Sequence, residues 1–214
     1  MNTKSTWGSH VPINKSILET FDITGVIELG AGYNSTQMFF ENNSKVLSIE
    51  TSKEWVNEIR KNIKEDENHR ILYYDIPSNI IKSTRRHQVT KEFLTQAVQF
   101  VDSQITSEFN FLFIDSISCL RYDMLVNLYH KFDVITFHDY QKPGIKNHYN
   151  DGYINEDDDY QMYIDQTYEA HTGILIKKTL TDKIDQLMSN LQRNTFDYIK
   201  GSEAKLIEVE NGNM

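Results

Sequence analysis

The chain has 214 residues, and its 22 Lys and Arg against 31 Asp and Glu give a formal net charge of −9. This length suits one domain with one core and is short for two catalytic domains. An apolar content of 39% with 12% aromatic residues excludes a disordered chain. The acidic balance disfavours a broad nucleic-acid surface, because duplex binding needs clustered cations.

The beginning of the chain and its cysteine content indicate the compartment. Cys119 is the only cysteine, which excludes an intramolecular disulfide and a multi-cysteine metal cluster. The first residues lack the apolar core of a secretion signal, and no stretch approaches the roughly 18 apolar residues of a membrane span. We therefore expect a cytoplasmic protein without membrane contact. Its oligomeric state stays open, a homodimer included.

Short β-branched runs alternate with longer helical patterns from about residue 25 to residue 180. This alternation predicts a single α/β domain over residues 1–214, with a doubly wound, mostly parallel, Rossmann-like sheet. We expect strands at 26–29, 45–49, 71–74, 109–114, 132–137, 173–177 and 205–209. We expect helices from near residue 35 and at 52–65, 90–104, 121–130 and 182–191.

Two segments outside this alternation are expected to lie next to a ligand-binding site at the edge of the sheet. Residues 1–20 are expected to dock on the core near the cofactor site. Residues 141–168 are expected to form a loop excursion on the substrate side, because the stretch is polar and carries Pro143 and an acidic run.

The first predicted strand ends in a glycine turn. Gly30 and Gly32 allow the backbone to pass close to a ligand, and Ser35 is placed to cap the following helix. Glu50 follows the second strand, about 20 residues beyond the turn, where a carboxylate can accept hydrogen bonds from ribose hydroxyls. The two features together predict an adenosine site.

The residues of the turn favour one adenosine ligand over another. The third glycine of a dinucleotide fingerprint is replaced by Ser35, and Glu28 precedes the turn. A carboxylate at that point suits a cationic sulfonium better than a pyrophosphate, so electrostatics favours S-adenosylmethionine over NAD. The structural alternatives are a helix-capping role for Glu28 and an ordinary helix N-terminal acid at Glu50.

The run Glu28-Leu29-Gly30-Ala31-Gly32, together with Glu50, resembles the first motif of the class I S-adenosylmethionine-dependent methyltransferases. The resemblance covers about residues 25–140. It implies the Rossmann-like methyltransferase fold and S-adenosylmethionine as cofactor. The loop of Gly30, Ala31 and Gly32 would then wrap the methionine part, Glu50 would hold the ribose, and Asp75 would approach the adenine.

A second group of polar residues follows the fourth and fifth strands. These strands end in Asp115 and in His138-Asp139, and neighbouring parallel strands bring such ends together. Two carboxylates and an imidazole can bind a divalent cation or perform acid–base chemistry. Asp115 is also a candidate contact for the cofactor.

This arrangement is similar to the metal-dependent small-molecule O-methyltransferases of the macrocin type. The resemblance implies that Asp115 and Asp139 bind Mg²⁺ or Mn²⁺, with His138 as a third ligand or as the general base. His138 stands where an acid is common, and no second acid follows Asp115, which argues against magnesium. Metal-free catalysis by His138 and purely structural roles for His138 and Asp139 stay open.

These features together predict an enzyme that transfers the methyl group of S-adenosylmethionine to an oxygen or nitrogen of a small-molecule or glycan-like acceptor. One alternative is a non-catalytic module that senses or sequesters S-adenosylmethionine or S-adenosylhomocysteine, because function lies in the site and not in the fold. A less favoured alternative is a nucleic-acid methyltransferase that uses the basic cluster at 82–87. No base-methylation signature follows the fourth strand.

Overall fold

Eight strands form one sheet in the computed structural model, which describes residues 8–43, 45–77, 89–140, 149, 158–200 and 202–209. The order across the sheet is β3-β2-β1-β4-β5-β7-β6-β8. The strands are β1 (Val26–Leu29), β2 (Val46–Glu50), β3 (His69–Tyr73), β4 (Phe111–Ile114), β5 (Val134–His138), β6 (Tyr160–Asp165), β7 (Thr172–Lys177) and β8 (Leu206–Glu208). Strands β1 to β5 pair in parallel, whereas the other pairings are antiparallel.

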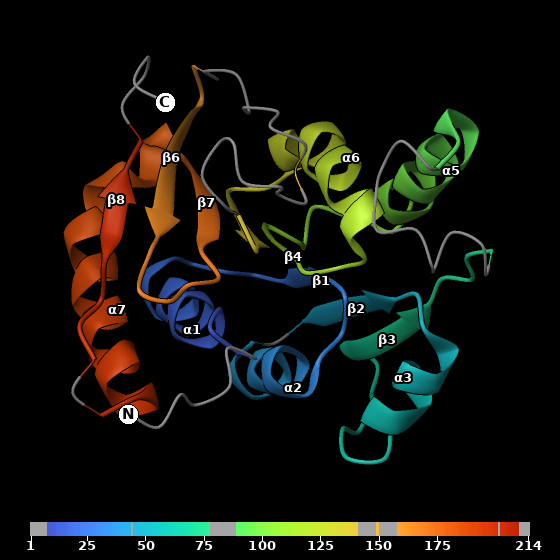
Figure 1. Cartoon of the computed structure of the whole chain (residues 1–214), viewed down its shortest axis with the longest axis horizontal. Helices are drawn as coiled ribbons and strands as arrows, with labels where there is room; N and C mark the ends of the chain where they lie inside the picture. The colour runs from blue at the N-terminus through green and yellow to red at the C-terminus, as the bar shows by residue number, and fades with distance from the viewer. Residues whose placement is uncertain are drawn as a thin grey trace.

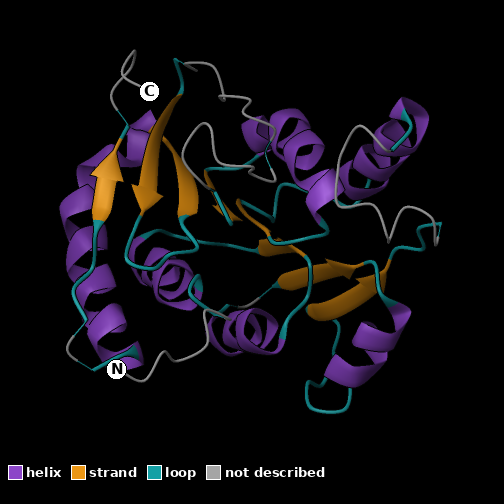
Figure 2. Cartoon of the chain, viewed as in Figure 1, coloured by secondary structure: helices purple, strands orange, loops and turns teal. Residues whose placement is uncertain are grey.

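Helices cover both faces of the sheet, as Figure 1 and Figure 2 show. They are α1 (Val11–Thr20), α2 (Tyr33–Asn42), α3 (Lys53–Ile59), α5 (Lys91–Asp102), α6 (Ser118–Leu128) and α7 (Ile184–Tyr198), with the 3₁₀ turns η2 (Tyr129–Lys131) and η3 (Lys178–Lys183). The apolar side chains of α1, α2 and α7 form one buried cluster, and those of α5 and α6 form another on the opposite face. The predicted doubly wound, mostly parallel α/β sheet is confirmed. No helix within the described ranges is both long and apolar enough to cross a membrane.

Strand β4 shows how the sequence produces two cores. Phe111 and Phe113 point into the cluster of α1, α2 and α7, whereas Leu112 and Ile114 point into the cluster of α5 and α6. Successive side chains of a strand face opposite sides of the sheet, so a continuous apolar run serves both cores. All four residues are fully buried.

The strand order creates a switch point between β1 and β4. From β1 the chain moves outward to β2 and β3, and then it returns to β4 and continues in the other direction to β5. In open α/β sheets the crevice beyond the strand ends at such a point is where ligands bind. The candidate site is therefore expected at the C-terminal ends of β1 and β4.

Helix α1 is a difference from the sequence-based prediction, which expected only a docking segment there. Its buried face carries polar residues whose hydrogen bonds are made inside the fold. Thr136 Oγ1 donates to Asn14 Oδ1 at 2.7 Å, Asn194 Nδ2 to Ser16 Oγ at 2.9 Å, and Asn190 Nδ2 to Thr20 Oγ1 at 2.9 Å. These buried polar residues break the apolar period on which helix prediction depends.

Strand β6 is a second difference, because residues 160–165 form a strand inside the range 141–168 that was expected to be a loop. It pairs with β7 on one side and β8 on the other. Its sequence does not alternate strictly between apolar and polar residues, and an acidic run precedes it, so the local pattern is typical of a loop. Residues 141–148 and 150–157 of the expected excursion lie outside the described residues.

Asp165 at the end of β6 is a buried carboxyl group without a charged partner among its described contacts. It accepts a hydrogen bond from the Thr167 amide at 2.9 Å and is 2% exposed. Burial raises the pKa of Asp165 to about 6, and the hydrogen bonds from Thr167 offset part of that rise. Folding therefore favours the protonated acid, and the fold is penalised once this group ionises.

We expect Asp165→Asn to stabilise the protein at pH 8 by about 1–3 kcal/mol, because the neutral amide avoids the cost of burying a charge. The gain should shrink as the pH falls below 6 and should be small near pH 4, where the carboxyl group is protonated in the folded state and about half protonated in the unfolded state. Urea unfolding at pH 4, 6 and 8 measures this. A gain that does not depend on pH would contradict it.

Candidate functional site

A cavity of about 490 Å³ lies at the C-terminal ends of β1, β2, β4 and β5. This volume is within the range of about 300–1,000 Å³ that ligand sites occupy. Its lining comes from the N-terminal segment, the glycine turn, the start of α2 and the ends of the strands. The lining residues are Gly8, His10, Gly30, Ala31, Gly32, Tyr33, Asn34, Ser35, Glu50, Trp55, Asp115, Ser116, Ile117, His138, Asp139 and Ala170.

The glycine turn is shaped by its contact with the end of β4. Gly30 has φ +95°, and a Cβ atom there would lie 2.4 Å from the carbonyl oxygen of Asp115. Only glycine fits this conformation and this approach. The N-cap of α2 is Gly32, and not Ser35 as predicted; the Gly32 amide donates to Thr36 Oγ1 at 2.9 Å.

Glu28 lies beneath the turn and does not line the cavity. It is fully buried and accepts hydrogen bonds from the hydroxyls of Ser48 and Thr36, the latter at 2.7 Å. Burial raises the pKa of Glu28 to about 7 against the effect of these bonds, and Oε1 has no hydrogen-bond partner. Through Thr36, Glu28 holds the glycine turn in place.

Glu50 lies at the edge of the cavity, at the end of β2. Its Oε1 accepts from the amides of Thr51 at 2.6 Å and Ser52 at 2.8 Å, and burial raises the pKa of the carboxyl group. Trp55 also lines the cavity, and its indole Nε1 donates to the carbonyl of Ala31 at 2.6 Å. Ser52 is the N-cap of α3, and its Oγ accepts a hydrogen bond from the Trp55 amide. These contacts fix a carboxylate opposite the glycine turn.

Asp75 is, after Glu28, a second predicted site residue that the fold leaves outside the cavity lining. Its Oδ1 accepts a hydrogen bond from the Tyr73 hydroxyl at 2.7 Å, and the residue is exposed. It is not among the residues that line the cavity. Residues 78–88, which include the basic cluster, lie outside the described residues.

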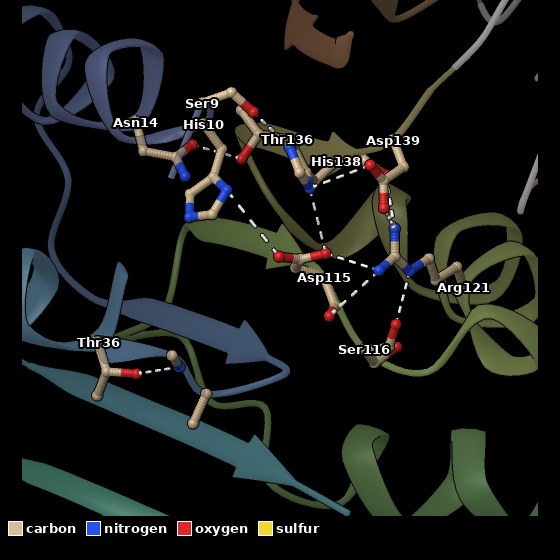
Figure 3. Close-up of polar contacts among 12 residues, drawn as sticks. Ser9, His10, Asn14, Thr36, Asp115, Ser116, Arg121, Thr136, His138 and Asp139 are labelled. Atoms are coloured by element: carbon tan, nitrogen blue, oxygen red, sulfur yellow. Dashed lines mark hydrogen bonds and ion pairs between the residues drawn. The ribbon is translucent and has the colours of Figure 1, made fainter. Parts of the chain in front are cut away.

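Asp115, His138 and Asp139 come together at the other end of the cavity, as the sequence predicts (Figure 3). His138 Nδ1 lies 3.3 Å from Asp115 Oδ1 and 3.6 Å from Asp139 Oδ1. Asp139 has φ +60°, a left-handed conformation that Asp tolerates better than most residues and that costs free energy. The turn after β5 thereby directs the carboxylate back toward β4.

Arg121 of α6, which no sequence pattern marks as a site residue, joins these carboxylates (Figure 3). Its NH2 group donates to Asp115 Oδ1 at 2.6 Å, and its NH1 group donates to Asp139 Oδ2 at 2.7 Å and to the His138 carbonyl at 3.0 Å. Burial by itself would raise the pKa of Asp115, but the hydrogen bond from His138 and the charge of Arg121 hold it below its ordinary value. Nothing in the sequence separates this arginine from a surface one, because its partners lie on other elements.

The N-terminal segment completes this end of the cavity with Ser9 and His10. Ser9 Oγ lies 2.8 Å from His138 Nε2, and the donor depends on the histidine tautomer. His10 packs against Phe113 and His138, with ring centroids 4.8 Å and 4.7 Å away. Burial and the neighbouring His138 lower the pKa of His10 to about 4, so its ring is neutral. Trp7 lies outside the described residues.

The histidines and acids that converge most closely differ from the predicted metal ligands. The described ligand atoms of His10, Asp115 and His138 lie within 4.8 Å of one another, and Asp139 is not in this group. Asp139 Oδ2 is instead held by Arg121. A guanidinium therefore occupies the space between the two carboxylates where the resemblance would place a magnesium ion.

We expect Arg121→Met to reduce the free energy of unfolding by about 3–5 kcal/mol, because it leaves two carboxylates without their buried countercharge. The exposed pair of Arg193 and Glu19 is the matched control, and Arg193→Met should cost less than about 1 kcal/mol. Urea unfolding at neutral pH measures both. Equal and small losses of unfolding free energy in the two variants would contradict a stabilising role for the buried Arg121.

No protein-family model and no curated protein sequence matches the chain. Solved structures with a similar arrangement include an RNA methyltransferase from Salinibacter ruber in complex with S-adenosylhomocysteine, with TM-score 0.43, 11% identity, and coverage of 78% of this chain and 90% of that one. A dimethyladenosine transferase from Plasmodium falciparum matches with TM-score 0.41 and 11% identity over 78% and 61% of the two chains. A phosphoethanolamine N-methyltransferase from Haemonchus contortus matches with TM-score 0.42 and 10% identity over 89% and 49%. At these low scores, the assignment of fold rests on the strand order, and that of function on the geometry of the site.

Proposed function

We propose that the protein is an S-adenosylmethionine-dependent methyltransferase that acts on an oxygen or nitrogen of a small-molecule acceptor. The observation that carries this is one cavity with two chemically distinct ends. One end holds the glycine turn and Glu50, and the other holds His138 with Asp115 and Asp139. A nucleoside cofactor and an acceptor would therefore meet inside a single pocket.

The cofactor end fits an adenosine that carries an amino acid. Glu50 is fixed by backbone amides through Oε1, so its carboxylate is pre-oriented toward ribose hydroxyls. Tyr33, Asn34 and Ser35 line the cavity at the start of α2, where helix amides favour a carboxylate group. When bound, the sulfonium of S-adenosylmethionine supplies a methyl group that is already activated for transfer.

The other end fits an acceptor whose proton must be removed. His138 lines the cavity, and in the tautomer that donates Nε2–H to Ser9 its Nδ1 is free to take a proton from a hydroxyl or amine. The carboxylate of Asp115, 3.3 Å from Nδ1, would stabilise the imidazolium that forms. Arg121 keeps Asp115 and Asp139 in place. Orientation of acceptor against methyl donor supplies most of the remaining rate enhancement.

The charge of the lining favours a small acceptor over a nucleic acid. Among the described residues that line the cavity there is no Lys or Arg, whereas three are acidic. A polyphosphate backbone would lack the cations that its binding requires. Neutral or cationic hydroxyl and amine compounds carry no such requirement.

We expect Glu50→Ala to weaken binding of S-adenosylmethionine and S-adenosylhomocysteine by at least about 30-fold, because it removes charge-assisted hydrogen bonds to the ribose. Glu54→Ala, in the first turn of α3 and outside the cavity lining, should leave affinity unchanged. Calorimetric titration of the three proteins measures this. Equal affinity in wild type and Glu50→Ala would refute the placement of the ribose.

Turnover distinguishes an enzyme from a non-catalytic cofactor sensor. With S-adenosylmethionine labelled on its methyl group, we expect label to enter a pool of small hydroxyl and amine compounds and not total RNA. His138→Gln should lower that rate by about 10²–10⁴-fold, the contribution of a general base, and change cofactor affinity by less than about threefold. His130→Gln, in η2 and outside the lining, is the control. Label in RNA alone would contradict the acceptor class, and no transfer at all would indicate a sensor.

A further inference from the structure

We propose that His10, Asp115 and His138 form a binding site for one divalent transition-metal ion of the Zn²⁺ type at the inner end of the cavity. This ligand set differs from the carboxylate pair that the sequence resemblance implies, because the N-terminal segment replaces Asp139 with an imidazole. The ion would bind to the free protein, without the methyl donor.

The three groups surround one point from three separate parts of the fold. His10 precedes α1, Asp115 follows β4, and His138 ends β5, and all three line the cavity. His138 Nδ1 lies 3.3 Å from Asp115 Oδ1, and His10 Nδ1 lies 3.9 Å from Asp115 Oδ2. Ligand atoms bound at about 2.0–2.1 Å around a tetrahedral zinc are about 3.3 Å apart. One ligand atom from each of the three residues lies within 4.8 Å of the others, so the groups must approach one another by up to about 1.5 Å to hold the ion.

His10 is the observation that points to a ligand. Its side chain is 7% exposed, and neither ring nitrogen has a hydrogen-bond partner. A buried imidazole without a partner costs free energy, and such groups in folded proteins usually satisfy their nitrogens. A metal ion between His10 and Asp115 would satisfy the ring, and Figure 3 shows the ring directed toward that carboxylate.

Ser9 gives His138 the outer contact that metal-binding histidines commonly have. A proton on His138 Nε2 that is donated to Ser9 Oγ, 2.8 Å away, leaves the Nδ1 lone pair directed at the proposed ion. Asp115 is held in the same way, because Arg121 binds its Oδ1 and leaves Oδ2 toward His10. Both side chains are therefore pre-oriented by neighbours that do not bind the ion.

The local charge suits a dication. Asp115 and Asp139 carry two negative charges and Arg121 one positive charge, so with neutral imidazoles the cluster has one net negative charge. Two imidazoles with one carboxylate is a ligand set typical of Zn²⁺ and Fe²⁺, whereas Mg²⁺ prefers oxygen ligands. Three protein ligands leave a coordination position open toward the cavity. On the proposed function, an acceptor oxygen would bind there and lose its proton more easily, and His138 would then hold the ion instead of taking the proton itself.

The test uses the untagged full chain, stripped by a chelator and dialysed against Co²⁺, Zn²⁺ or Mg²⁺ without methyl donor. We expect one Co²⁺ or Zn²⁺ per chain and no Mg²⁺ at the same concentration. Bound Co²⁺ should give visible d–d absorption and two strongly shifted imidazole N–H resonances in the NMR spectrum of the wild type, one from each histidine.

Variants locate the ion. His10→Phe keeps the ring packing against Phe113 and should weaken Co²⁺ binding by at least about 100-fold and remove one shifted resonance. His10→Asn is the second variant in case the phenyl ring disturbs folding, which circular dichroism reports. His69→Ala is the matched control, because His69 Nδ1 also lies near a carboxylate, 3.2 Å from Asp66 Oδ2, but outside the cavity.

Three results would overturn the proposal: no Co²⁺ bound by the wild type, fewer than two shifted imidazole resonances, or binding that His69→Ala abolishes and His10→Phe does not. These readouts need no turnover, so they separate this proposal from the proposed function. Methyl transfer by a protein that binds no metal would refute the metal site alone. Metal binding without methyl transfer would refute the methyltransferase alone.

Discussion

The buried guanidinium of Arg121 is the interaction on which the acidic end of the cavity depends. It binds the side chains of Asp115 and Asp139 and the carbonyls of Ser116 and His138, so one helix residue connects the ends of two strands. Without it, two carboxylates would share a desolvated space and repel each other. Arg121 and His138 both contact Oδ1 of Asp115, and Oδ2 is left toward His10.

The other end of the cavity depends on a second constraint, the close approach of β1 and β4 at the switch point. Gly30 can pass the carbonyl of Asp115 only because it has no Cβ atom. Glu28 and Thr36 support this turn from below and connect it to α2. Gly30, which shapes the cofactor end, thus lies against Asp115, which belongs to the acidic end. This contact explains how two chemically different ends share one cavity.

The N-terminal segment connects the outer helix α7 to the acidic end of the cavity. Helix α1 is bound to α7 and to β5 through buried side-chain hydrogen bonds, and it carries Ser9 and His10 to His138 at its beginning. The polar buried face of α1 is therefore more than a packing surface, because it positions two residues at the inner wall of the cavity. A helix with an apolar face could bury the same area, but apolar contacts would fix its orientation less strictly than hydrogen bonds do.

Sequence by itself determined the doubly wound sheet, most of the strands, the glycine turn with Glu50, and the convergence of Asp115 with His138 and Asp139. Each of these follows from local patterns, namely apolar runs, glycines and polar residues at strand ends. Helix α1, strand β6, the clamp by Arg121 and the place of His10 were decided only by the tertiary structure. Polar residues stand in them where local rules expect apolar ones, and their partners lie on other elements of the fold. Buried polar contacts of this kind acquire their meaning only when the fold brings both partners together.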